Sequence, residues 1–290
     1  GDDPHGPGPH LPRMGEVSVG EVSADETAIR DIPLSARLTE LRSWSELSAA
    51  TGGAALVRHE VGPDLIAPAH RLGDAVLFLR EIQTGAIGAV VLGPEPEEVA
   101  ELLGSPWQSW PGYRGVRGVT VERANHRALE EVGVRGIGLW SSMVVSRDDL
   151  VRRPVPEGIH PDSDVDRQEA RAFVDAHYSS KWLAPHPVGE TWVGLRDDAG
   201  ILRATGLAAV TPAGVVRLSG ITVPAAERGR GLGRAVTQDL VEHGLTVADE
   251  VTLGVDDDNH AARVTYSRMG FRVSHDFSSG LLVPGKGRSQ

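Results

Sequence analysis

The sequence predicts an α/β fold in which helices flank a mixed, mostly antiparallel sheet. Strand-like runs at 191–196, 201–211 and 215–223 are joined by the short turns "DDAG" and "PAG", which is the pattern of antiparallel hairpins. The third run leads through a helix into another strand, and such a crossover joins parallel strands. We therefore expect both kinds of strand pairing in one sheet.

An internal sequence similarity predicts that the chain contains two domains with the same fold. Residues 119–133 and 251–270 both begin as Val-Thr strands, continue with Asn-His, and then form a helix with Ala at the third position after the Asn. Chance similarity of two helix caps is the alternative. A length of 290 residues is compatible with one large domain or two of about 150. We interpret this similarity as a tandem arrangement of two related domains.

In the first half, regular structure is expected to begin with a helical pattern at 34–44. A later helix is predicted by "PEPEEVAELL", because Pro suits the first turn and acidic side chains suit the positive end of the helix dipole. Residues 118–133 predict a strand, a capping Asn125 and a helix. The remaining strands of this half are expected at 54–60, 75–81, 86–93 and 136–145.

The second half follows a polar, proline-rich stretch at 146–164 that predicts a linker. A helix is expected within 164–183, before the three hairpin-linked strands. After them, Val236, Leu240, Val241 and Gly244 share one face of a helix. The order ends with a strand at 250–255, a helix closed by Gly270 in the position after its C-cap, and the closing strands "FRVSHDF" and "SGLLV".

Composition narrows the function. The chain has no Cys, which excludes disulfides, thiolate metal sites and a Cys nucleophile. A formal net charge of −11 argues against general nucleic-acid binding. No apolar run approaches the roughly 18 residues of a membrane helix, and the first thirty residues hold no apolar targeting segment. We therefore expect a cytoplasmic protein without nucleic-acid or membrane partners, with no metal site, and with an oligomer left open.

The stretch "ERGRGLGRAV" at 227–236 is the most informative motif. It follows a strand that ends at Val223 and precedes a helix. Glycines let the backbone approach a ligand closely, and successive N–H groups at a helix start form an anion site. The arginines at 228, 230 and 234 add positive charge around it. The pattern favours binding of a pyrophosphate.

Two other phosphate-binding patterns fit less well. The P-loop needs Gly-Lys-Ser/Thr, and no Lys is present in this stretch. The dinucleotide fingerprint needs a third glycine where Arg234 stands. Asp249 and Glu250 lie about 20 residues downstream, as that fingerprint requires, but too little chain remains for the rest of a doubly wound sheet.

Two motifs together resemble the GNAT acyltransferase superfamily. The segment "ITVPAAERGRGLGRAVTQDLVEHG" is similar to the acetyl-CoA-binding segment of that family, with its R/Q-x-x-G-x-G/A loop after a strand. The segment "DNHAARVTYSRMGF" looks like the family's next motif. The resemblance implies a GNAT fold and implies that acetyl-CoA, as acyl donor, contacts Ile221, Thr222, Val223, Arg228, Gly229, Arg230, Gly231, Leu232, Gly233, Arg234, Asn259 and Ala262.

The resemblance also implies a catalytic role for Tyr266, which would protonate the departing thiolate. Core packing is the alternative for this tyrosine. For Asn259, helix capping and cofactor contact are both open. The strand before the loop, "VVRLSGITV", holds Arg217 and Ser219 where many relatives have a Glu, so a direct carboxylate base is in doubt. The candidates by composition are Glu190, His186, His177 and His275, and a water relay is favoured.

The first half is interpreted as a degenerate GNAT-like domain, because "GPEPEE" puts acidic residues where phosphate would bind. This two-domain plan resembles that of mycothiol synthase. Aromatic residues Tyr178, Trp182 and Trp192 could form part of the acceptor site, although ordinary packing is the favoured interpretation for each of them. The predicted organisation is a disordered tail at 1–30, the degenerate domain at 31–147, a linker at 148–163, the catalytic domain at 164–283 and a tail at 284–290.

The predicted function is N-acetyl transfer from acetyl-CoA to a primary amine of a small molecule. Direct attack in a ternary complex is expected, because the chain has no Cys to carry the acyl group. The alternatives are a non-catalytic CoA-binding sensor and an interaction protein with a vestigial phosphate loop.

Overall fold

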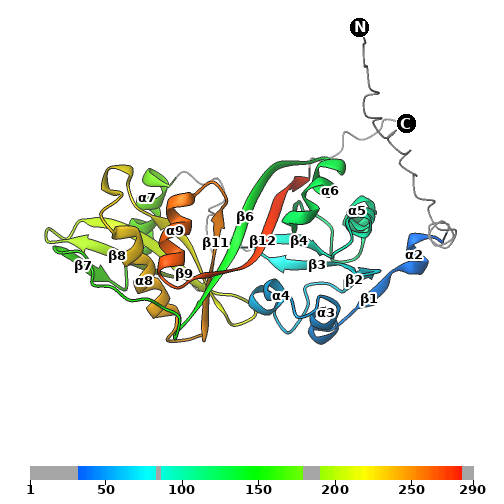
Figure 1. Cartoon of the computed structure of the whole chain (residues 1–290), viewed down its shortest axis with the longest axis horizontal. Helices are drawn as coiled ribbons and strands as arrows, with labels where there is room; N and C mark the ends of the chain where they lie inside the picture. The colour runs from blue at the N-terminus through cyan, green and yellow to red at the C-terminus, as the bar shows by residue number, and fades with distance from the viewer. Residues whose placement is uncertain (1–31, 83–85, 179–189, 283–290) are drawn as a thin grey trace, which may run out of the picture. The chain divides into compact units, whose positions relative to one another are not determined.

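The computed structural model describes residues 32–82, 86–178 and 190–282 (Figure 1). The chain divides into two compact units, Gly1–Arg37 and Leu38–Gln290. The described part of the first unit holds the short helix α2 (Leu34–Arg37), after which Arg37 Nε donates a hydrogen bond to the carbonyl oxygen of Ile32.

A single twelve-stranded sheet runs through the second unit in the order β1-β2-β3-β4-β5-β12-β6-β11-β10-β9-β8-β7. Two pairs of neighbouring strands, β4–β5 and β10–β11, are parallel, and the other pairs of neighbouring strands are antiparallel. This confirms the predicted mixed, mostly antiparallel sheet. The strands are β1 (Thr39–Leu41), β2 (Ala69–Leu72), β3 (Ala75–Glu81), β4 (Ile87–Leu92), β5 (Gly118–Glu122), β6 (Val134–Ser146), β7 (Ile159–Asp162), β8 (Glu190–Asp197), β9 (Leu202–Val210), β10 (Val216–Thr222), β11 (Glu250–Asp256) and β12 (Arg272–Leu282).

Helices flank this sheet, and several begin with the caps that their sequences provide. Ser43 and Glu46 form a reciprocal capping box at α3, and the Asp166 side chain accepts two backbone N–H groups at the start of α7. The α-helices of this unit are α3 (Trp44–Ala50), α4 (Ala55–Glu60), α5 (Pro96–Gly104), α6 (His126–Glu131), α7 (Arg167–His177), α8 (Leu232–Gly244) and α9 (His260–Arg268). Three short 3₁₀ turns are η1 (Trp107–Ser109), η2 (Arg123–Asn125) and η3 (Ala225–Glu227).

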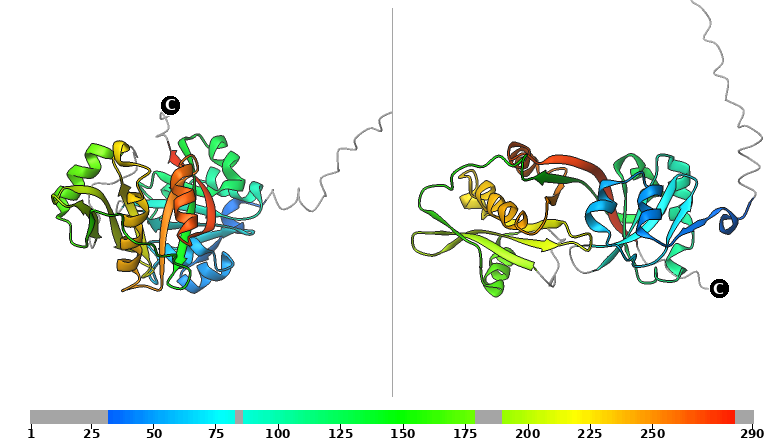
Figure 2. Two further views of the ribbon diagram at one scale, coloured as in Figure 1. Left: turned by 60° about the vertical axis from the view of Figure 1, so that its left-hand side comes forward. Right: turned by 90° about the horizontal axis from the view of Figure 1, so that it is seen from below.

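The two halves of the sheet repeat one plan. A parallel strand pair is joined by a helix, and a further helix and a long antiparallel strand follow, as β4-α5-β5-α6-β6 in the first half and β10-α8-β11-α9-β12 in the second. The long strands are exchanged. β12 lies between β5 and β6 of the first half, while β6 pairs with β11 of the second half (Figures 1 and 2). The fold is thus a tandem pair of GNAT-like halves that share their closing strands.

Three sequence expectations need correction. The segment 54–60 forms helix α4 instead of a strand; its buried residues at 56, 57 and 60 follow helical spacing, and a short apolar run alone does not separate the two structures. The segment 34–44 divides into α2, the edge strand β1 and the start of α3, because Thr39–Leu41 pairs with β2. The predicted linker contains β7, which pairs with β8.

The helix after the glycine cluster is anchored as its sequence predicts. Val236, Leu240, Val241 and Gly244 are buried on the face of α8 that packs against the sheet, within the larger core of the second half. Burial of the Val and Leu side chains among them contributes about 1.5–3 kcal/mol each. The first residue of α8 is therefore held firmly at the end of β10. Gly270 has a φ of 98° and follows the C-cap of α9, as expected.

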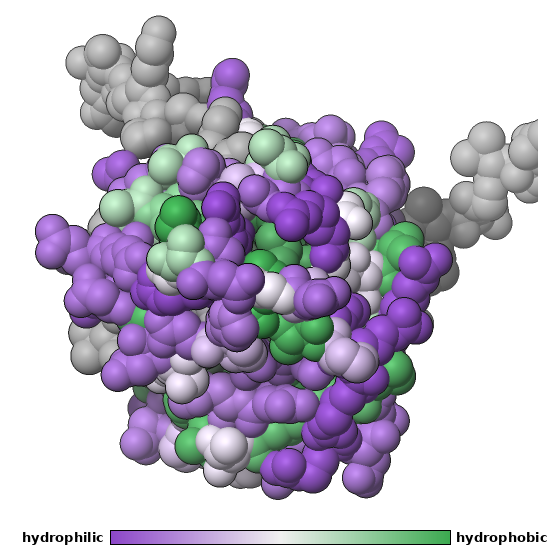
Figure 3. All heavy atoms as spheres, turned by 90° about the vertical axis from the view of Figure 1, so that its left-hand side faces the viewer, coloured by the Kyte–Doolittle hydropathy of each residue, from purple (hydrophilic) through white to green (hydrophobic). Residues whose placement is uncertain are grey.

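The face shown in Figure 3 carries mainly hydrophilic side chains, with hydrophobic ones scattered among them. Among the helices that the structure describes, none is long and apolar enough to cross a membrane.

Candidate active site

The glycine cluster forms an open loop between η3 and α8. Gly229 and Gly231 have φ angles of 79° and 80°, a region that L side chains rarely adopt. Gly231 is the N-cap of α8 and supplies no side chain to satisfy the first N–H groups of the helix. A Cβ atom at Gly229 would meet nothing within 4 Å, and one at Gly231 would meet only Pro156 Cγ at 3.7 Å. Neighbouring side chains leave the loop open.

The backbone N–H groups of this loop are available to a ligand. The Arg228 N–H donates to the Ala225 carbonyl, and the Ala235 N–H donates to the Gly231 carbonyl. Between these two positions, no N–H from residue 229 to residue 234 donates to another residue that the structure describes. Successive free N–H groups at the positive end of a helix dipole are the components of an anion site.

The three arginines of the loop differ in their contacts. Arg230 is mostly exposed and forms an ion pair with Glu227. Arg228 Nε donates a long hydrogen bond to the Val223 carbonyl at 3.4 Å. Arg234 turns to the preceding segment, where it donates to the Pro154 carbonyl at 2.7 Å. Arg234 therefore braces the loop, and the side chains of Arg228 and Arg230 remain at the surface.

The parallel strands β10 and β11 separate beside this loop. They pair only where Val216–Leu218 faces Val251–Leu253, and β10 continues to Thr222 without β11 as a partner. Its pairing with β9 shifts register between Ser219 and Thr222. The backbone of Ser219–Thr222 therefore faces an opening in the sheet.

A cavity of about 670 Å³ occupies that opening. Of the residues predicted to bind acetyl-CoA or to act in catalysis, Ile221, Asn259 and Tyr266 line it. Thr222 is buried, and its hydroxyl donates to the Gly220 carbonyl at 2.9 Å. The remaining predicted residues lie outside the cavity wall. Val223 and Ala262 pack against the core of the second half, and residues 228–234 form the open loop beyond the end of β10.

Tyr266 projects from α9, with its ring 5.7 Å from that of Phe271. It is 9% exposed. Burial raises the pKa of the Tyr266 phenol above its usual value, and the neighbouring Tyr178 raises it further. The hydroxyl therefore stays protonated at neutral pH and can donate a hydrogen bond or a proton. Asn259 caps the same helix, accepting from the Ala262 N–H at 3.3 Å, which confirms its capping role.

The general base remains a prediction, and the base candidates that the structure describes do not line the cavity. Glu190 is buried in an ion pair with Arg167, and His275 bonds to Glu122 at 2.9 Å. His177 is exposed at the end of α7. His186, like Trp182, lies outside the described residues. Neither Glu190, His177 nor His275 belongs to the cavity wall.

One carboxylate does line the described cavity, namely Asp256 at the end of β11. Partial burial raises the pKa of the Asp256 carboxyl, and the charge of Asp258 raises it further. A carboxyl with a raised pKa is better suited to accept a proton near neutral pH. Sequence reasoning missed it because the run "DDDNH" was interpreted only as a helix cap.

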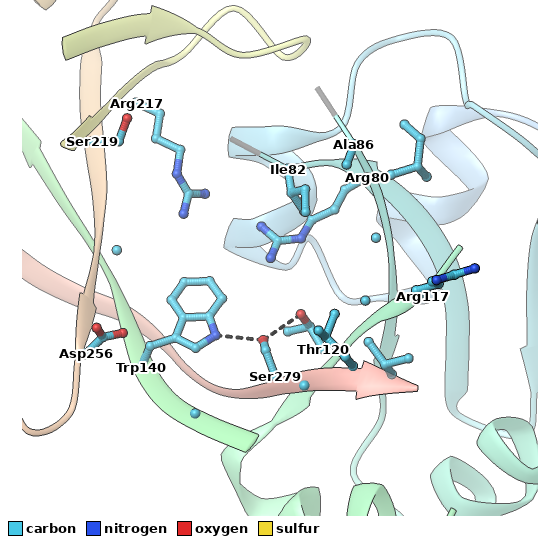
Figure 4. Close-up of a pocket in the computed structure, with 18 of the residues that line it drawn as sticks. Arg80, Ile82, Ala86, Arg117, Thr120, Trp140, Arg217, Ser219, Asp256 and Ser279 are labelled. Carbon is cyan, nitrogen blue, oxygen red and sulfur yellow. Dashed lines mark hydrogen bonds between the residues drawn. The ribbon is translucent and has the colours of Figure 1, made fainter. Parts of the chain in front are cut away.

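The opposite wall of the cavity combines residues of the first half with Arg217 of the second half. Arg80 on β3 and Arg217 on β10 both form ion pairs with the buried carboxylate of Glu60 on α4. Their guanidinium carbons lie 5.5 Å and 5.9 Å from the centre of the Trp140 ring (Figure 4). Burial alone would raise the pKa of Glu60, but Arg217 and Arg80 outweigh this effect and hold it below its ordinary value. Trp140 Nε1 in turn donates to Ser279 Oγ at 2.8 Å.

In the first half, the position that corresponds to the glycine loop and the strand opening is occupied by protein side chains. β4 and β5 stay paired from Gly88 to Val91, so these strands do not separate there. The Gly93 N–H donates to a Glu122 carboxylate oxygen at 3.0 Å, and Asn125 Nδ2 donates to the Gly93 carbonyl at 2.8 Å. Asn125 therefore uses its side chain to bind Gly93, and it does not cap α6 as predicted.

The fold and the site define a protein with the mixed α/β GNAT architecture in two halves. The comparison with protein families agrees. Residues 152–271 match the acetyltransferase (GNAT) family.

Solved structures share the fold. A GCN5-related N-acetyltransferase from Kribbella flavida is similar with a TM-score of 0.52 and 18% sequence identity, covering 83% of this chain and 96% of that one. A Drosophila protein is similar with a TM-score of 0.52 and 15% identity, covering 84% of this chain and 87% of that one. A comparison with curated proteins found no significant match.

Proposed function

We propose that the protein transfers an acetyl group from acetyl-CoA to a primary amine of a small molecule. One observation supports this above the others. Where β10 separates from β11, an open loop with free N–H groups follows the end of β10, and the buried Tyr266 lines the cavity between the two strands. A candidate anion site and a candidate proton donor therefore both adjoin the opening between β10 and β11.

Different residues bind different parts of acetyl-CoA in this proposal. In this proposal the N–H groups of residues 229–234 hold the pyrophosphate of acetyl-CoA, because they lack other partners and lie at the start of α8. The exposed backbone of Ser219–Thr222 pairs with the pantetheine arm, since β11 leaves it unpaired. Ile221 to Val223 then orient the thioester toward the cavity. The glycines at 229 and 231 admit the phosphates without a side-chain clash.

The chemical step is a direct exchange of one bond for another. The neutral amine of the acceptor attacks the thioester carbonyl, a C–N bond forms and the C–S bond breaks. Tyr266 donates its proton to the departing sulfur, which its neutral state at pH 7 permits. Asp256 receives the proton of the amine, directly or through water, because it is the carboxylate in the described cavity wall.

The test is acetyl transfer by the full chain and by the variant Tyr266→Phe. We expect the variant to bind CoA with unchanged affinity in calorimetry and to lose about 10²–10⁴-fold in kcat. Tyr113→Phe is the matched control, because that tyrosine is also buried but donates to the Pro68 carbonyl in the first half. Full turnover by Tyr266→Phe would remove its catalytic role, and absence of CoA binding by the unmodified protein would exclude the proposal.

A further inference from the structure

The chemistry of the acceptor can be inferred from the far end of the cavity. The described residues that line it carry four guanidinium groups and one carboxylate. These residues are Arg80, Arg114, Arg117, Arg217 and Asp256. Counting the Glu60 carboxylate behind the wall still leaves an excess of positive charge. This excess occurs in a chain of net charge −11, so it is a local property of the cavity.

Two of these arginines are fixed in place inside the cavity. Figure 4 shows the side chains of Arg80 and Arg217 converging over the Trp140 ring from opposite sides. The Arg80 side chain is 7% exposed, and its Nε has no hydrogen-bond partner among the described residues. Buried guanidinium groups normally have partners for their N–H groups, so this one indicates that a hydrogen-bond acceptor is missing nearby.

The local sequence makes room for this arrangement. A Cβ atom at Gly254 would lie 3.2 Å from Arg217 Nη2 and 3.4 Å from Trp140 Cε3. The guanidinium and the indole therefore meet across a position that has no side chain. Glu60 binds the guanidinium groups from the side of α4, so it orients them and leaves Trp140 as the floor below.

The arginines share a strand face with the proposed reaction centre. Arg217, Ser219 and Ile221 alternate on β10 and all line the cavity. Gly220, with a φ of 60°, lies at the register shift between Ser219 and Thr222 and also lines the cavity. Since the guanidinium groups and Tyr266 line the same cavity, one small molecule in it can have one end at the guanidinium groups and its amine near Tyr266.

The geometry points to an acceptor that carries a carboxylate as well as the primary amine, which is to say a free amino acid. The planar guanidinium group binds a carboxylate through two parallel hydrogen bonds, and a single negative charge suits this cavity. The inference rests on the proposed acetyl transfer and names the substrate class for the same site.

The experiment compares acids with their amides. Acetyl transfer is measured with the common L-amino acids, with ω-amino acids of three to six carbons, and with the primary amide of each. We expect at least one acid to exceed its amide by roughly ten- to hundredfold in kcat/KM, because a charge-assisted hydrogen bond contributes about 1.5–3 kcal/mol. Arg217→Gln should remove most of this preference, and Arg217→Lys should keep part of it.

Controls separate this inference from the proposed function. Arg272→Gln removes the same charge from an exposed ion pair outside the cavity, so its preference should equal that of the unmodified protein. Calorimetry with CoA verifies that each variant folds and binds the donor. Equal rates for acids and amides, a preference that survives Arg217→Gln, or turnover only with amines that lack a carboxylate would each overturn the inference while acetyl transfer stands. Failure of CoA to bind would overturn both.

Discussion

The substitution Gly231→Glu tests the phosphate-binding loop most directly. Gly231 has a φ of 80°, and a residue with a Cβ atom in this region costs about 1–2 kcal/mol. Gly214, in the turn between β9 and β10, also has a φ of 80°, and a Cβ atom there would meet nothing within 4 Å. Gly214→Glu is therefore a matched control that carries the same strain and the same added charge.

The two variants should lose similar stability. For a protein of this size, a loss of 1–2 kcal/mol lowers Tm by about 2–8 °C. Their affinities for CoA should differ. The Gly231→Glu side chain adds a carboxylate at the first N–H groups of α8, where it competes for the donors proposed to hold the pyrophosphate. Losing two charge-assisted hydrogen bonds costs about 3–6 kcal/mol, which is more than a hundredfold in affinity.

Calorimetric titration with CoA, together with thermal unfolding of each variant, measures both quantities. We expect binding by the unmodified protein and by Gly214→Glu, and no detectable binding by Gly231→Glu. If Gly231→Glu binds CoA within about threefold of the control while showing the same loss of stability, the loop does not hold the pyrophosphate. The reasoning from open N–H groups would then be refuted.

Three other predictions concern titratable groups. Asp256→Asn should reduce kcat and remove the acidic limb of the pH–rate profile. Asp258→Asn should move that limb to lower pH, because the Asp258 charge raises the pKa of Asp256. Unchanged pH–rate profiles in both variants would contradict the role of Asp256 as the base. Glu60→Ala should reduce the free energy of unfolding by about 3–5 kcal/mol in denaturant titration, since two buried arginines lose their shared carboxylate; a loss under 1 kcal/mol would show that the cluster is not structural. Burial raises the pKa of the Glu122 carboxyl, but hydrogen bonds from His275 and from the Gly93 N–H outweigh burial, so the pKa is lowered. The contribution of Glu122 to stability is therefore present above pH 4.5 and is lost as the pH falls through the lowered pKa. Glu122→Gln should flatten that part of the stability curve, and an unaltered curve would disprove the linkage.

The sequence was sufficient for local elements that have strong signals. The hairpins of β8–β10 follow from turn residues and alternation, and α8 follows from its glycine start and its apolar face. The segment 54–60 was misassigned because seven residues contain too little periodicity to separate a helix from a strand. Residues 31–147 and 164–283 as separate domains remain a prediction.

The end of the cavity where we propose that the acceptor binds could not be predicted from the sequence. Arg80, Trp140 and Arg217 belong to three strands, and Glu60 belongs to a segment interpreted as a strand. Only the three-dimensional packing brings them together. By contrast, Tyr266 was found because it belongs to a contiguous motif with a family resemblance. Motifs local in sequence can be found in this way, whereas a binding surface assembled from distant strands cannot.

The exchange of β6 and β12 has a consequence for how the chain is made. During synthesis, about 125 residues separate the end of β6 from the start of β12, which must insert between β5 and β6. Until then both strands have an unsatisfied edge, and such edges attract other chains. The nascent first half is thus an aggregation hazard that chaperones would have to shield, and its folding is completed only when the second half closes it.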